Sequence, residues 1–167
     1  MWRRGVLACT LLIGILAGRA NAQPPVLLGY RESDIRLAVR RAAEGAAARL
    51  ARPGCQDLFS DFTDEAGQRL STALAASGKS PNEASSVLRF FDDGAAPQCQ
   101  AGTTLAFTQT GSRLIRVCGP QFRERSLQNR STTEIIVIHG FLHTLGLGEH
   151  PPTSEAITER VAARCGS

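Results

Sequence analysis

Aromatic side chains with a polar group are scarce in this 167-residue chain, which has one Trp and one Tyr. The Trp is Trp2, at the N-terminus, and the Tyr is Tyr30. Sugar-binding sites and the centres of protein interfaces depend heavily on such rings. Their scarcity argues against a carbohydrate-binding module.

The longest hydrophobic run lies at the N-terminus. Arg3 and Arg4 precede an almost wholly apolar stretch, residues 5–18. That stretch has the length of a signal-peptide core and is too short to span a membrane comfortably. Ala20 and Ala22 put small residues at the positions that signal peptidase reads. We therefore predict a signal peptide at 1–22, cleaved after Ala22, and a single secreted or periplasmic domain at 23–167. The alternative is a retained N-terminal anchor.

The predicted mature chain also lacks an excess of charge. The full sequence has a formal net charge of +4, from 19 basic and 15 acidic residues. Arg3, Arg4 and Arg19 lie in the predicted signal peptide, so 16 basic residues remain against the 15 acidic ones. Nucleic acids and anionic membranes attract strongly basic surfaces. We therefore predict no nucleic-acid partner and no membrane partner after cleavage, and we expect a monomer.

Four cysteines follow the predicted signal peptide: Cys55, Cys99, Cys118 and Cys165. An even number of cysteines in an exported chain indicates disulfide bonds, and four cysteines allow three pairings. We favour Cys99–Cys118, because these residues flank a predicted hairpin, and this leaves Cys55 to pair with Cys165. The alternative is that the thiols are free and buried.

Apolar residues recur at helical spacing near both ends of the domain. Ile35, Val39 and Leu50 belong to a stripe that predicts a helix from Ser33 or Asp34 to about residue 51. A second helix is predicted from Thr153 or Ser154 to Cys165. The other short elements expected are a strand at 58–62, a helix at 68–77, a helix start or turn at 80–83, and an extended segment at 87–91.

The centre of the fold is predicted from two features. Two β-like runs, 103–108 and 113–118, are joined by a short loop and indicate a β-hairpin. Ser131 to Glu134 then matches a capping box, and residues 135–145 are apolar apart from two His and one Thr. A helix that is apolar all round is buried. We therefore predict an α+β domain in which the hairpin, with one or two further strands, forms a small sheet packed on this helix.

All three histidines, His139, His143 and His150, lie within twelve residues. A separation of four residues puts His139 and His143 on one helix face, ~6 Å apart along the axis. Their ring nitrogens can then approach a single metal ion. The alternative is a pair of structural histidines bonded to backbone carbonyls. The spacing, with a further donor just beyond Gly146, favours a metal site.

Residues 139–150, HGFLHTLGLGEH, resemble the active-site helix of the zincin metallopeptidases, whose core is H-E-x-x-H. His139 and His143 match the two helix ligands, and Gly146 matches the glycine of the turn. The resemblance implies zinc as the cofactor and a peptide or protein as substrate or ligand. It extends more loosely, over about residues 55–165, to small secreted bacterial zincin-like proteins. The third ligand of the extended pattern falls on Glu149, and the neighbouring His150 is the alternative.

The chain departs from the zincin pattern at Gly140, where the family has its catalytic glutamate. That glutamate takes a proton from the metal-bound water and passes it to the leaving amine. Such general acid–base catalysis contributes about 10²–10⁴-fold in rate. Gly140 is either natural in a non-catalytic relative or a one-base change from a Glu codon. The only Met is Met1, so the Met-turn of metzincins is also missing.

These observations predict a secreted zinc-metallopeptidase-like protein that binds zinc but is weakly active or inactive, a pseudoenzyme. The alternative is a disulfide-stapled module that uses no metal and binds a peptide or protein along the edge of the hairpin.

Overall fold

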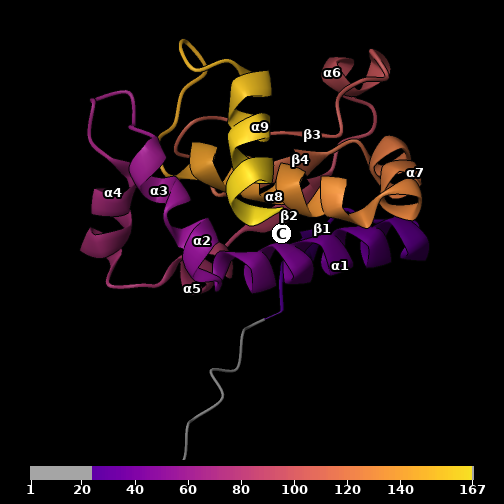
Figure 1. Ribbon diagram of the computed structural model, residues 1–167. Coiled ribbons are helices and arrows are strands. Elements are labelled where there is room, and N and C mark those ends of the chain that lie inside the picture. The colour runs from indigo at the N-terminus through magenta and orange to yellow at the C-terminus, as the bar shows by residue number, and fades with distance from the viewer. Residues whose placement is uncertain (1–23, 167) are drawn as a thin grey trace, which may run out of the picture.

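The computed structural model describes residues 24–166 (Figure 1). The predicted signal peptide, residues 1–22, lies outside them. The described chain is an α+β structure in which helices share a core with the buried side chains of a small mixed sheet. None of its helices is long and apolar enough to cross a membrane.

The sheet contains the predicted hairpin and two further strands. Strands β1 (Val26–Leu28), β2 (Arg89–Asp92) and β4 (Leu114–Val117) run parallel to one another, and β3 (Ala106–Phe107) pairs antiparallel with β4. The spatial order is β1-β2-β4-β3, which leaves β3 at one edge of the sheet. The prediction of a hairpin with one or two additional strands is therefore confirmed.

The helices that position the site are α1 (Ser33–Leu50), α8 (Arg130–Thr144) and α9 (Ser154–Cys165). The predicted first and last helices are thus confirmed, and α8 contacts both of them (Figure 1). No residue from 131 to 144 is exposed, which confirms the prediction of a buried helix. The remaining helices are α2 (Pro53–Gln56), α3 (Leu58–Asp61), α4 (Leu70–Ser77), α5 (Pro81–Ser85), α6 (Pro97–Gln100) and α7 (Gly119–Gln128).

The strand expected at 58–62 is wrong, because this segment contains helix α3. Leu58, Phe59 and Phe62 are all buried, whereas Ser60 is exposed. A strand would place residues 58, 60 and 62 on one face, so the observed burial fits a helical turn instead. The ring of Phe59 packs edge-on against Phe141 of α8, with 5.8 Å between centroids.

The capping box expected at Ser131 to Glu134 is also wrong. Asn129 caps α8, because its side-chain oxygen accepts a hydrogen bond from the Thr132 N–H at 3.3 Å. The Glu134 side chain turns into the protein instead of back to the helix start. There it pairs with a partly buried guanidinium from α1.

That guanidinium belongs to Arg49, which links three helices. Its Nε donates to Glu134 Oε2 at 2.7 Å, and its Nη1 donates to the carbonyl of Cys165 at 2.6 Å. Arg130 donates to the other Glu134 oxygen at 2.9 Å. Gly45 faces the same carboxylate, and a Cβ at this position would overlap it. The lack of a side chain at residue 45 therefore lets α8 lie close to α1.

Both disulfides have the pairing favoured from the sequence. Cys55 is bonded to Cys165, with 4.6 Å between Cα atoms, and Cys99 to Cys118, with 5.2 Å. The first joins α2 to the end of α9, and the second joins α6 to the residue after β4. Two disulfides are typical of proteins in an oxidising, extracytoplasmic environment.

Gly45→Ala is expected to lower the free energy of unfolding, because its methyl group would displace Glu134 from Arg49. In a helix that lacks such a neighbour, the same change stabilises by about 1 kcal/mol. In a Glu134→Ala background we therefore expect Gly45→Ala to become stabilising. Urea unfolding of the four proteins measures this reversal of sign. A stabilising effect of Gly45→Ala in the wild-type background would contradict the packing described above.

Candidate metal centre

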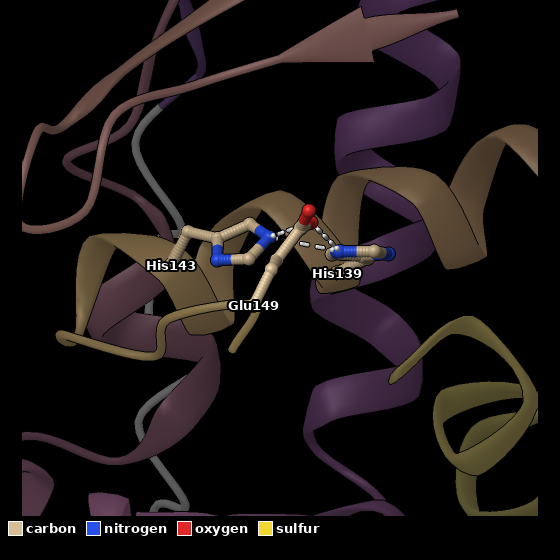
Figure 2. Close-up of side chains that lie close together, drawn as sticks. All are labelled: His139, His143 and Glu149. Atoms are coloured by element: carbon tan, nitrogen blue, oxygen red, sulfur yellow. Dashed lines mark hydrogen bonds and ion pairs between the residues drawn. The ribbon is translucent and has the colours of Figure 1, made fainter. Parts of the chain in front are cut away.

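His139 and His143 lie one turn apart on α8, and their rings converge (Figure 2). Their Nε2 atoms are 2.8 Å apart, and the ring centroids are separated by 4.8 Å. The two residues are only 6% and 8% exposed. The prediction that both imidazoles share one face of a buried helix is confirmed.

The turn after α8 brings a carboxylate to the same point. The helix closes with Gly146, whose φ of +104° lies in the region that favours glycine. The chain then reverses, and Glu149 Oε1 lies 3.1 Å from His143 Nε2 and 3.5 Å from His139 Nε2 (Figure 2). His139, His143 and Glu149 form a group that could hold a metal ion.

His150, the alternative third ligand, lies outside this group. Its side chain is exposed at the rim of the adjoining cleft. The structure thus brings Glu149, and not His150, to the two helix histidines.

Hydrogen bonds at the far side of each ring fix which nitrogen carries the proton. Nδ1 of His143 is 2.7 Å from the carbonyl of Leu147, which can only accept, so it must carry the hydrogen. Nδ1 of His139 is 2.8 Å from the Thr158 hydroxyl, which itself donates to the carbonyl of Ser154. The hydroxyl oxygen therefore accepts from His139. In their neutral forms, both rings therefore present an unprotonated Nε2 to each other.

With both rings neutral, the two Nε2 atoms and Glu149 Oε1 are three acceptors with no donor among them. Three such acceptors repel one another unless a cation lies between them. Burial lowers the pKa of His139 to about 4, with a further contribution from the charge of His143 and opposition from Glu149. His139 is thus uncharged at neutral pH and offers its lone pair. Ligands about 2.0–2.1 Å from a tetrahedral metal are ~3.3 Å apart, close to the separations seen here. The donor set fits a divalent metal ion.

The sequence matches no protein-family model and no curated protein, and the structure matches no solved structure. Function is therefore inferred from the residues of this site.

Gly140 lies against the sheet rather than beside an empty space. A Cβ at this position would be 3.0 Å from Cδ1 of Ile115, a β4 residue that is 1% exposed. Only a few tenths of an ångström of movement would be needed to admit one. The glycine thus permits close contact between α8 and β4, and it supplies no catalytic carboxylate.

A cleft of about 700 Å³ opens in front of the histidines and Glu149. Residues 103–110, which include the edge strand β3, line this cleft together with the candidate metal centre. Gly140 and Ile115 also line it. A ligand in the cleft would therefore contact both the metal centre and the open edge of the sheet.

Sequence reasoning missed two residues of this region, Thr158 and Glu65. Thr158 lies on α9 and orients His139, and Glu65 lies in a loop that reaches the rim of the cleft. Neither belongs to a motif with residues 139–150. Only the folding of distant segments onto α8 brings them there.

Replacement of the third ligand tests the geometry. Metal-free protein titrated with cobalt(II) should develop the absorption of a coordinated ion. We expect Glu149→Ala to weaken binding by more than about tenfold, and His143→Ala to abolish it. His150→Ala is the matched control and should bind as the wild type does. Normal binding by Glu149→Ala together with loss in His150→Ala would contradict this assignment.

Proposed function

We propose that this protein is a secreted, zincin-like zinc-binding protein that has the metal centre and peptide cleft of a metallopeptidase but not its general base. The observation that carries the proposal is the meeting of two imidazole Nε2 atoms and one carboxylate oxygen. They come from a segment, residues 139–150, that resembles the zincin motif. Two His and one Glu are a ligand set that zinc uses in catalytic sites.

His139, His143 and Glu149 would hold the zinc ion. Bound zinc polarises a carbonyl oxygen and lowers the pKa of its water. Thr158 and the carbonyl of Leu147 keep the two rings in the tautomer and orientation that binding needs. The chain's own residues thus prepare the site before an ion arrives.

An extended peptide is the ligand that best fits the cleft. Strand β3 pairs with β4 on one side only, so its other edge can bond to a peptide backbone. Residues 103–110 would hold that peptide in the cleft that the zinc ligands also line. This placement supports a peptide or protein as substrate or ligand.

No carboxylate on α8, and no ligand of the proposed metal centre, takes the place of the missing glutamate. Gly140 has none, and Glu134 is buried between Arg49 and Arg130. Glu149 is engaged with the histidines. We therefore expect little or no hydrolysis by the protein as it stands.

The alternative is a binding module that uses the same cleft without metal. The structure gives it some support, because the apolar core and both disulfides would hold the fold without an ion. The free edge of strand β3, which lines the cleft, would then form the entire binding site.

Metal content separates these two functions. Protein secreted from cells and purified without chelators should contain about one zinc ion per chain. His143→Ala should lose the zinc while its circular dichroism shows a folded domain. Elemental analysis by mass spectrometry provides the count. Wild-type protein that is folded, contains no zinc and takes up none when zinc is added would leave only the metal-free module.

Restoring the glutamate tests the peptidase ancestry. We expect Gly140→Glu, combined with Ile115→Val, to gain chelator-sensitive proteolysis of unfolded protein substrates, by about 10²-fold or more over Ile115→Val alone. The Val removes the Cδ1 atom that lies 3.0 Å from the new Cβ position.

Gly140→Gln in the same Ile115→Val background is the matched control, because Gln has the size of Glu but cannot act as a base. Two results would contradict the claim that the cleft is that of a peptidase from which only the general base is missing. One is equal activity of the Glu and Gln variants, and the other is no activity in either variant while both bind zinc.

A further inference from the structure

The carboxylate of Glu65 lies at the rim of the cleft, beside the segment that carries the third metal ligand. Its Oε1 is 3.1 Å from the position that a Cβ of Gly148 would occupy, and Gly148 directly precedes Glu149. Glu65 does not belong to the group of potential metal ligands. It is a second carboxylate in the same cleft, with no role in holding the ion.

The loop that carries Glu65 is held in place on both sides. Asp64 Oδ1 accepts hydrogen bonds from the N–H groups of Ala66 at 3.0 Å and Gln68 at 2.8 Å, which closes a tight turn. The Glu65 N–H donates to the carbonyl of Gly146 at 3.2 Å, on the turn that follows α8. The backbone of Glu65 is thereby fixed relative to the metal centre.

The Glu65 side chain is exposed and has no cation beside it. Within residues 24–166, it forms no ion pair or hydrogen bond. Neither Lys nor Arg is found among the described residues that line the cleft. Exposed carboxylates are ionised at neutral pH, and a cleft focuses the field of an uncompensated charge.

We propose that Glu65 selects a ligand with a basic side chain, so that the cleft prefers peptides in which Arg or Lys lies next to the metal-bound group. This inference rests on the proposed function, because the metal centre fixes the register of the peptide. The ion attracts an electron-rich group, such as a carbonyl oxygen. Glu65, which lines the same cleft, attracts a cation.

The ionic contact between Glu65 and the ligand is solvent-exposed, so its effect is modest. Exposed ion pairs contribute up to about fivefold in affinity at moderate salt. Opposite charge at the same position should repel by a similar factor. The preference should weaken as ionic strength rises, since salt screens exposed charges.

Short peptide hydroxamates test this proposal, because the hydroxamate binds zinc and fixes the register. At each of the first three positions from the hydroxamate, a set of three peptides would carry Arg, Gln or Glu and be otherwise identical. Affinities for the zinc-loaded protein come from calorimetry. At one position we expect Arg to bind about fivefold more tightly than Gln, and Glu to bind more weakly than Gln.

Glu65→Gln should remove this order, and Glu65→Lys should reverse it, with the zinc content unchanged. Glu44→Lys is the matched control: Glu44 is an exposed acid on α1 outside the cleft, and its replacement changes the net charge equally. It should leave the order intact.

Zinc-dependent binding with the same order in the wild type and Glu65→Lys would overturn the role of Glu65 and leave the proposed function standing. Failure of every peptide to bind, or failure of the protein to bind zinc, would overturn both.

Discussion

Most of helix α8 is buried, so the polar groups that it carries into the core need partners inside the protein. Unmatched polar groups in such a place cost free energy, and unmatched charges cost far more. Glu134 is matched by Arg49 and Arg130, His139 by Thr158, and His143 by the carbonyl of Leu147. One group of polar atoms has no such partner, because the neutral rings turn their Nε2 lone pairs toward each other and toward the Glu149 carboxylate. A metal ion could occupy the point where these atoms meet.

Two glycines set how closely the rest of the protein can enclose this helix. Gly45 on α1 admits the Glu134 carboxylate, and Gly140 on α8 admits Ile115 of β4. A glycine in a helix interior costs about 1 kcal/mol relative to alanine, and here that cost is offset by close packing. Gly140 therefore has a structural role in this protein, because it allows close contact between α8 and β4.

Sequence patterns predicted the elements whose burial follows a regular period. The stripe on α1, the β3–β4 hairpin and the wholly apolar α8 are of this kind. The prediction was wrong where few residues were available. Leu58 to Phe62 suits either a strand or a helical turn, and only the burial in the folded protein, with Ser60 exposed between buried residues, distinguishes them. The prediction was also wrong at Ser131, where a local capping pattern competed with the distant Arg49, and the buried charge pair prevailed. Helix α7 follows β4 directly and was not predicted from the sequence at all.

The same division holds at the site. The sequence by itself determined that His139 and His143 share a face, because helix geometry is local and four residues make about one turn. It also determined that a glycine turn follows them and that no carboxylate stands at residue 140. Which of two adjacent residues, Glu149 or His150, returns to the metal centre depends on how the chain leaves that turn. The protons on the rings depend on Thr158 of another helix, and the charge at the rim depends on Glu65 of a distant loop. These features were decided by tertiary structure alone, since they join segments whose relative positions are set by core packing and not by any local pattern.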